Sequence, residues 1–296
     1  MSVPQRIAIT GSSGLIGTAL VGHLKAEGHT VQRLVRRSPI AVDEVQWDPQ
    51  TGFVDLEPLR GVDAVIHLAG VGVGDKRWNR KYKTEILNSR LLGTSAIANA
   101  VAEIRPQVFI SASAAGWYGE SGNRAVVETD RSGDDFLAAV CREWESAANL
   151  AGDVRTVKIR TGLVLDPTGG ALGKMLPLFR FGLGGKMGNG KQWWSWITLH
   201  DQIRAIVFVL ENPISGPVNM TAPNPVTNQE FTSALARAMH RPALFPVSAI
   251  ALKIALGGFS SEILGSKRVI PHVLQEAGFA WDYPHISEAL AKLIEH

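Results

Sequence analysis

The sequence lacks the residues that would build a disulfide framework or a cysteine-ligated metal site. Cys141 is the only cysteine among 296 residues. A single thiol excludes an internal disulfide bond and a cysteine zinc site, so we expect Cys141 to be a small buried hydrophobic residue and predict no metal ligands. Tyrosine is also scarce, with three in the chain, so a mechanism that needs a phenol has few candidates.

The chain also lacks a strong charge of one sign and a long apolar run. Thirty Lys and Arg against 27 Asp and Glu give a net charge of +3, which does not form the basic stripe that nucleic-acid binding needs. The longest apolar stretch, Leu244–Phe259, is interrupted by proline, serine and lysine and is too short to cross a bilayer. No secretory signal precedes the first strand-like run. We therefore expect a cytoplasmic protein with a small-molecule substrate, without a nucleic-acid or membrane partner.

What is present is an alternation of short apolar runs and helical patterns, which is typical of βαβ units on a parallel sheet. Helices are predicted over 15–27, 84–104 and 135–150, the last of them capped by Asp134 or Asp135. Strands are predicted over 6–10, 30–35, 45–47, 64–68, 108–111, 156–159 and 218–220. The fold class is therefore α/β, a Rossmann-type doubly wound parallel sheet with a smaller, mostly helical C-terminal lobe.

The composition changes after residue 165. A glycine-rich segment leads into Gln192–Trp196, which contains three tryptophans, of which at least one is expected in the core. Helical patterns separated by proline-containing loops follow from Pro223 onward. We predict a dinucleotide-binding domain over 1–165, to which 197–222 return, and a substrate lobe formed by 166–196 and 223–296.

A glycine triplet lies between the first predicted strand and the first predicted helix. Gly11, Gly14 and Gly17 have the spacing G-x-x-G-x-x-G, in the loop where a Rossmann domain binds the pyrophosphate of its cofactor. The helix that follows presents free N–H groups and its positive dipole end to the phosphates. The sequence therefore predicts a bound dinucleotide.

The end of the second strand selects the cofactor. An acidic residue about 20 positions beyond the glycines binds the ribose 2′-OH of NAD, but Val35 stands there. Arg36 and Arg37 follow, and a guanidinium suits a 2′-phosphate because it pairs in a bidentate manner. The alternative is that both arginines are solvated surface charges. We predict NADP(H).

With these features, the sequence resembles the extended short-chain dehydrogenase/reductase superfamily, and more narrowly its atypical "epimerase family" branch. The resemblance covers the whole chain and implies a Rossmann domain, bound NADP(H) and a branch-specific C-terminal domain. It rests on the glycine triplet and on the segments His67-Leu-Ala-Gly70, Lys76-Arg-Trp78, Ser111-Ala-Ser-Ala-Ala-Gly-Trp-Tyr118-Gly119, Arg160-Thr-Gly-Leu-Val-Leu165, Gln192-Trp-Trp-Ser-Trp-Ile197 and Pro225-Val-Thr-Asn228.

Active members of the superfamily use a tyrosine and a lysine four residues apart on one helix face. In this sequence the residues four beyond the three tyrosines are Ile86, Gly122 and Ser287, so the pair is absent. Aligning the helix on Glu145 puts Leu137 and Cys141 in the two positions.

The catalytic candidates that remain are Ser113, as the hydroxyl that polarises the substrate, and Tyr118, as an acid or base if its pKa is lowered. Arg90 replaces the asparagine of the superfamily pattern, and it either binds a phosphate or substrate carboxylate or lies on the helix surface. Arg160 either contacts cofactor or substrate or forms an ordinary ion pair. The predicted cofactor-binding residues are Gly11, Ser13, Gly14, Leu15, Ile16, Gly17, Arg36, Arg37, Leu68, Ala69, Gly70, Glu85, Arg90, Ser111 and Arg160.

Two hypotheses follow. The first is an NADP(H)-dependent epimerase-like or oxidoreductase-like protein that acts on a small or nucleotide-linked substrate. The second is a non-catalytic NADP(H)-binding sensor or assembly protein, and the missing Tyr-x-x-x-Lys pair is expected under it. The basic segment Lys76–Lys83, with its interleaved aromatic residues, is interpreted as a pocket rim or a solvated helix start. A homodimer is possible on this fold.

Overall fold

The computed structural model describes residues 3–295, and its central feature is an eight-stranded sheet with the order β12-β8-β6-β5-β1-β2-β3-β4. All neighbouring strands in it are parallel except β3 and β4, which are antiparallel. Its strands are β1 (Arg6–Thr10), β2 (Thr30–Val35), β3 (Glu44–Asp48), β4 (Phe53–Val54), β5 (Ala64–His67), β6 (Val108–Ala114), β8 (Arg155–Thr161) and β12 (Gly216–Met220). The predicted doubly wound α/β fold is confirmed.

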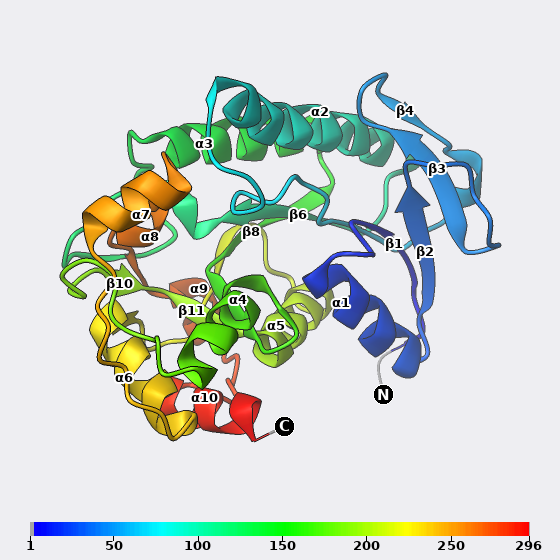
Figure 1. Ribbon diagram of the computed structural model, residues 1–296. Coiled ribbons are helices and arrows are strands. Elements are labelled where there is room, and N and C mark those ends of the chain that lie inside the picture. The colour runs from blue at the N-terminus through cyan, green and yellow to red at the C-terminus, as the bar shows by residue number, and fades with distance from the viewer. Residues whose placement is uncertain (1–2, 296) are drawn as a thin grey trace.

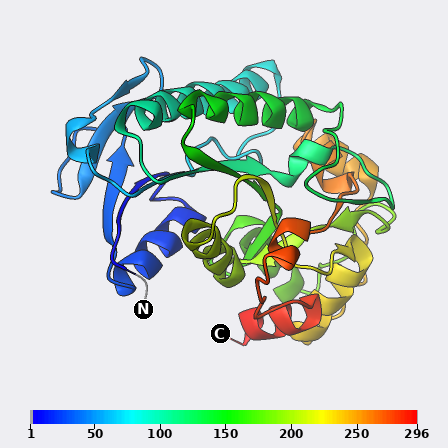
Figure 2. The same cartoon turned by 180° about the vertical axis from the view of Figure 1, so that it is seen from behind.

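Helices cover both faces of this sheet, as parallel strands require. On one face, α1 (Leu15–Ala26) and α5 (Leu199–Glu211) pack on side chains such as Ile7 and Ile9. On the other, α2 (Arg80–Ile104) packs on Ala8 and its neighbours, and α3 (Phe136–Ala148) lies beside α2. Figures 1 and 2 show the two pairs on opposite sides of the sheet. The continuous apolar runs of the central strands thus lie between two helical layers.

A second core lies below the carboxyl end of the sheet. Trp196 is fully buried in it, which confirms that one ring of the tryptophan cluster belongs to the core. The remaining α-helices are α4 (Gly170–Arg180), α6 (Asn228–Ala238), α7 (Ala249–Leu256), α8 (Ser260–Leu264), α9 (His272–Glu276) and α10 (Ile286–Ile294), and the remaining short strands are β7 (Ala125–Val126), β9 (Leu163–Asp166), β10 (Trp193–Trp194), β11 (Trp196–Thr198), β13 (Val226–Thr227) and β14 (Arg268–Val269).

The chain crosses between the two cores more than once. β12 joins the large sheet beside β8, and α5 packs against α1. β11 pairs with β9, and β14 pairs with β7. The division of the chain at residue 165 stays a proposal. Across residues 3–295, no helix is both long enough and apolar enough to span a membrane.

The start of α3 shows why this helix begins where it does. The side chain of Asp135 accepts a hydrogen bond from the backbone N–H of Ala138 at 2.9 Å, so Asp135 is the N-cap. Asp134, the other candidate, is exposed. The cap fixes the helix that carries Leu137, Cys141 and Glu145 toward the sheet.

We expect Asp135→Ala to lower the free energy of unfolding by about 1 kcal/mol, the usual loss for an N-cap. Asp134→Ala is the matched control and is expected to change it by less than about 0.5 kcal/mol, as for other exposed substitutions. Urea unfolding curves of both variants measure the difference. Equal losses for the two variants would show that Asp135 does not act as the cap.

Candidate functional site

The glycine loop joins β1 to α1 with very close backbone contacts. Gly11 has a φ of +68°, and a Cβ atom there would lie 2.8 Å from the backbone nitrogen of Ala69. A Cβ atom on Gly17 would lie 2.1 Å from the carbonyl oxygen of Gly11. Larger residues at these positions would push α1 away from β1 and from the segment after β5. The backbone is therefore as tight as the motif predicts.

The N-terminal end of α1 opens onto a cavity. Gly14 is the N-cap, and no side chain caps the first turn, so backbone N–H donors remain for an anion. Thr168 comes from the loop before α4, which brings the C-terminal lobe over the glycine loop. The cavity has a volume of about 320 Å³ and is lined by Ser13, Gly14, Leu15, Thr18, Ala19, Thr168 and Leu199. Free donors beside a cavity suit the phosphates of a dinucleotide.

The segment after β5 is fixed to β1 by a buried threonine. The Thr10 hydroxyl accepts hydrogen bonds from the backbone N–H groups of Leu68, at 3.1 Å, and Ala69, at 3.3 Å. It also lies 2.7 Å from Nδ1 of His67. Burial lowers the pKa of His67 to about 3, so this imidazole stays neutral. Thr10 thus holds Leu68, Ala69 and Gly70 next to Gly11.

The two arginines after β2 have different surroundings. Arg37 donates to both carboxylate oxygens of Glu44, at 2.6 and 2.7 Å, and this pairing lowers the pKa of Glu44 to about 2. Arg36 is exposed and forms no ion pair within residues 3–295. Both arginines were predicted from the sequence to bind a 2′-phosphate. In the structure the guanidinium of Arg36 is free to bind a 2′-phosphate, whereas Arg37 would have to break its ion pair with Glu44 to do so.

Ser113 and Tyr118 belong to a buried polar network that surrounds Arg160. Arg160 donates to both carboxylate oxygens of Glu145, at 2.8 and 3.0 Å, and to the Tyr118 hydroxyl at 3.1 Å. The Ser113 hydroxyl donates to Glu145 at 2.7 Å, and the Tyr118 hydroxyl donates to Oδ1 of Asn219 at 2.7 Å. β6, α3, β8 and β12 each contribute a residue, and Tyr118 lies in the 3-10 turn Ala115–Tyr118.

This network bears on the two catalytic candidates. Burial is the main cause that raises the pKa of Tyr118 to about 12, which is opposite to the shift that an acid or base near neutral pH requires. Ser113 is 4% exposed, and its hydroxyl is bound to Glu145. Either hydroxyl would have to leave its present partner to reach a substrate. Their catalytic assignment stays a prediction. Arg160 was predicted either to contact the cofactor or substrate or to form an ordinary ion pair, and in the structure it forms an ion pair with Glu145.

The remaining predicted cofactor ligands, Arg90, Glu85 and Ser111, differ in their burial and in their hydrogen-bond or ion-pair partners. Arg90 donates to the carbonyl oxygens of Val71, at 2.9 Å, and Ile86, at 3.2 Å. Its guanidinium carbon lies 4.8 Å from the ring centroid of Trp144, and burial lowers its pKa. Glu85 is exposed and lies 3.5 Å from Lys76. Ser111 is almost fully buried in β6.

Leu137 and Cys141 occupy the helix face where the tyrosine and lysine were sought. A Cβ atom on Gly116 would lie 3.3 Å from Cβ of Leu137 and 3.7 Å from Sγ of Cys141, so this face packs closely on the turn after β6. Burial raises the pKa of Cys141 to about 12. The expectation that Cys141 is buried is confirmed.

Two members of the network, Glu128 and Asn219, were missed in the sequence. Oε1 of Glu128 accepts from the backbone N–H groups of Asn219, at 3.0 Å, and Val273, at 3.2 Å. Asn219 lies between the buried apolar residues Val218 and Met220 of β12, and a polar residue at such a position is a signal that could have been used. Glu128 lies in an irregular loop, where no periodic pattern marks it.

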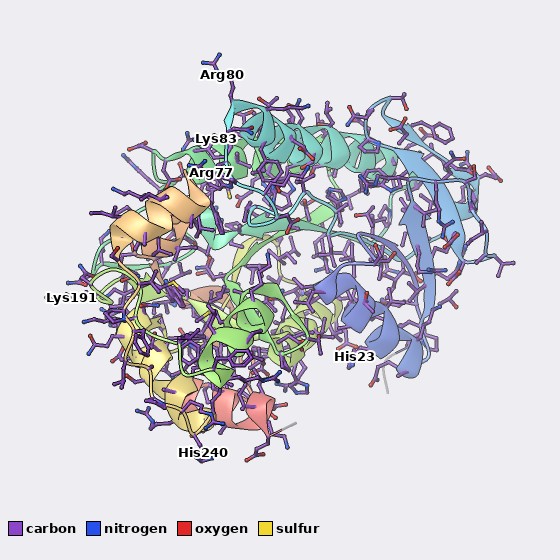
Figure 3. The ribbon with its side chains drawn as sticks, in the orientation of Figure 1. His23, Arg77, Arg80, Lys83, Lys191 and His240 are labelled. Atoms are coloured by element: carbon purple, nitrogen blue, oxygen red, sulfur yellow. The ribbon has the colours of Figure 1, made fainter. Side chains whose placement is uncertain are left out.

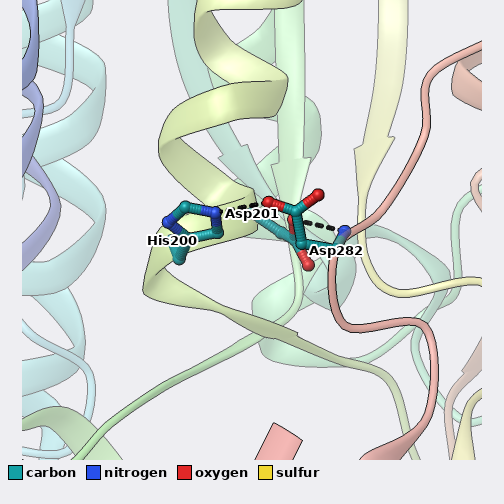
Figure 4. A group of neighbouring side chains, drawn as sticks. All are labelled: His200, Asp201 and Asp282. Atoms are coloured by element: carbon teal, nitrogen blue, oxygen red, sulfur yellow. Dashed lines mark hydrogen bonds and ion pairs between the residues drawn. The ribbon is translucent and has the colours of Figure 1, made fainter. Parts of the chain in front are cut away.

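His200, Asp201 and Asp282 form a cluster of potential metal ligands, shown in Figure 4. The Asp201 carboxylate already accepts hydrogen bonds from the backbone N–H groups of Asp282 and Tyr283, both at 3.0 Å, and from Arg204 at 2.9 Å. The guanidinium of Arg204 pairs with both Asp201 and Asp282, so it supplies the positive charge that balances these carboxylates. The cluster therefore connects α5 to the segment before α10.

Three comparisons place the chain among known proteins. The pattern of the NAD dependent epimerase/dehydratase family matches residues 7–221, and that of a domain of unknown function, DUF1731, matches residues 247–293. The chain is 44% identical to an epimerase family protein of Mycobacterium leprae over 290 residues, which is 96% of this chain and 94% of the relative.

Two solved structures are similar to this one. The human epimerase family protein SDR39U1, solved with NADPH, has a TM-score of 0.91 and 32% identity, over 98% of this chain and 99% of that chain. A nucleoside-diphosphate sugar epimerase of Corynebacterium glutamicum has a TM-score of 0.78 and 36% identity, over 99% of this chain and 58% of that chain.

The buried ion pair generates a stability prediction. Glu145→Gln leaves the charge of Arg160 buried without a carboxylate, so we expect a loss of about 3 kcal/mol in the free energy of unfolding. Glu143→Gln, on the exposed face of the same helix, is the control and is expected to have little effect. Chemical unfolding measures both. A loss below about 1 kcal/mol for Glu145→Gln would show that the pair is not important for stability.

Proposed function

The chain belongs to the NAD dependent epimerase/dehydratase family, and we propose that it binds NADP(H) and acts as an epimerase-like or oxidoreductase-like protein on a small, nucleotide-linked substrate. The observation that carries the proposal is the uncapped start of α1, which opens onto a cavity beside Gly11–Gly17. The NADPH in the structure of the human relative and the name of the Corynebacterium relative support the cofactor and the substrate class.

The roles of the binding residues follow from their positions. The N–H groups at the start of α1 would bind the pyrophosphate, and Leu68, Ala69 and Gly70 would form the floor on which the cofactor lies. Arg36, at the end of β2, would bind the 2′-phosphate. The cofactor supplies hydride chemistry when it is bound.

Arg90 brings a positive charge toward the part of the cleft that follows β5. Only carbonyl oxygens accept its hydrogen bonds within residues 3–295, and a mostly buried guanidinium without a carboxylate favours an anion beside it. We propose that this anion belongs to the bound cofactor or to a carboxylate of the substrate.

Proton transfer is the step for which the chain offers the fewest groups. The Tyr-x-x-x-Lys pair is absent from the sequence, and the two positions carry Leu137 and Cys141. In the proposed function, Tyr118 would exchange the proton and Ser113 would polarise the substrate, each after leaving its present hydrogen bond. This requirement favours a second candidate, a non-catalytic NADP(H)-binding sensor or assembly protein, because a sensor needs the cofactor loop and no proton relay.

The cofactor assignment is tested by Arg36→Ala. We expect the Kd for NADPH to rise about tenfold or more, because a charge-assisted contact with the 2′-phosphate is lost, while the Kd for NADH stays nearly unchanged. Arg37→Ala should alter the ratio of the two constants less, because its guanidinium is bound to Glu44. Fluorescence titration measures all four constants. Equal losses for NADPH and NADH in Arg36→Ala would contradict the NADP assignment.

Catalysis is tested with the purified protein saturated with NADPH or NADP+. Nucleotide sugars and small carbonyl compounds are added in turn, and the products and the nicotinamide absorbance are followed. Turnover that is abolished by Ser113→Ala or Tyr118→Phe, with an unchanged Kd for NADPH, would support the enzyme and identify the hydroxyl that takes part in the reaction. The sensor would be favoured if the cofactor binds tightly but no compound of the panel oxidises it, reduces it or is epimerised.

A further inference from the structure

We propose that a groove at the N-terminal end of α2 binds an organic monophosphate, meaning a phosphoryl group on an aromatic or apolar body. The groove has a volume of about 460 Å³, within the range of small-molecule sites. It is lined by Trp78, Asn79, Arg80, Lys83, Thr84, Leu87, Phe136 and Gly258. These residues come from the start of α2, the start of α3 and the connection between α7 and α8.

This groove is separate from the proposed cofactor cleft. The cavity beside the glycine loop is lined by residues of α1 and by Thr168 and Leu199, and the two cavities share no lining residue. The groove lies instead between the two helices that cover the opposite face of the sheet from α1. A ligand in it would therefore leave the cofactor loop accessible.

The charge at the groove is positive and is not neutralised by the protein. Arg77, Arg80 and Lys83 form no ion pair within residues 3–295, and the eight lining residues include no carboxylate. Figure 3 shows these three cations on the same side of the molecule, with Arg77 closest to α7 and Arg80 extending outward from the start of α2. Nearby Lys76, by contrast, is paired with Glu85. Unpaired cations around a concave surface attract an anion.

Lys83 is held in place by rings rather than by an acid. Its ammonium lies 4.8 Å from the ring centroid of Phe136 and 5.5 Å from that of Trp78. Such cation–π contacts orient the ammonium but leave its full charge in the groove. A Cβ atom on Gly258 would lie 3.3 Å from the Trp78 ring and 3.8 Å from Cε of Lys83, so the glycine lets the wall close on both.

The helix itself adds donors at the same point. The Asn79 side chain accepts from the backbone N–H of Tyr82 at 2.8 Å, and the first two N–H groups of α2, those of Arg80 and Lys81, have no acceptor within the helix. The positive end of this long helix dipole thus faces the same anion as the cations. Two backbone N–H donors and two side-chain cations match the several oxygens of a phosphoryl group.

The apolar wall determines the rest of the ligand. The Trp78 and Phe136 rings lie edge to face, with centroids 5.3 Å apart, and Leu87 extends the wall along α2. The Trp78 indole N–H donates to the carbonyl of Val73 at 2.7 Å, which fixes its ring as part of the floor. A bare phosphate would leave the partly exposed side chains of Phe136 and Leu87 in contact with water, whereas an aromatic body would cover them.

The experiment uses the full chain saturated with NADPH, so that the cofactor cleft is occupied, and 1-naphthyl phosphate as the probe. Calorimetric titration is expected to show saturable binding at one site, with weaker binding of inorganic phosphate and of 1-naphthol. Lys83→Gln should weaken the binding of 1-naphthyl phosphate about tenfold, the loss expected for a charge-assisted hydrogen bond. Lys81→Gln, an exposed position on the same helix outside the groove, is the matched control and should bind as the unmodified protein does.

An unchanged Kd for NADPH shows that Lys83→Gln is folded. If that variant is unstable, Arg80→Gln, which is exposed, should weaken probe binding in the same direction. The proposal is overturned by any of three results with the NADPH-saturated protein: no saturable binding, equal binding by the groove variants and the control, or binding of 1-naphthol as tight as that of its phosphate. A probe that binds only when NADPH is left out would also overturn it, because the probe would then occupy the cofactor cleft.

Discussion

The ion pair between Arg160 and Glu145 is the interaction on which the arrangement of the site depends. A charge that is 2% exposed needs a partner and further hydrogen bonds, and Arg160 finds them in α3, in the Tyr118 hydroxyl and in the carbonyl oxygen of Glu128. These bonds join a strand of the sheet to a covering helix and to the loops that approach the C-terminal lobe. The Trp117 ring, 3.9 Å from the guanidinium carbon, covers one side of it. Arg160 therefore contacts the turn after β6 through two of its residues, Trp117 and Tyr118.

Glu128 extends the same constraint to the C-terminal end of the chain. Its carboxylate accepts the backbone N–H of Asn219 in β12 and that of Val273 in α9. Removal of Arg160 or Glu145 would therefore affect more than one loop, because the segment that carries α9 is bound to the same network. The family pattern that ends at residue 221 and the second one that begins at residue 247 are coupled through these buried polar contacts.

The sequence predicted the sheet and the cofactor loop because both follow from local rules. β1 and β2 have the predicted bounds, and Gly11 and Gly17 are required by contacts that any side chain would break. The difference between Arg36 and Arg37 was not predictable, because it depends on Glu44 from the next strand. The Arg160 network and the α2 groove likewise join residues far apart in the chain, and no periodic pattern records such pairs.

The helix face of α3 shows how this chain differs from a tyrosine–lysine enzyme in physical terms. Successive turns of that face carry Leu137, Cys141 and Glu145, and the first two offer no proton at neutral pH because one is apolar and burial raises the pKa of the other. The carboxylate of Glu145 is bound by Arg160 and Ser113. The polar groups near this face are therefore all bound to one another within the network. A reaction at this site needs a conformation in which the network opens, and a binding function needs none.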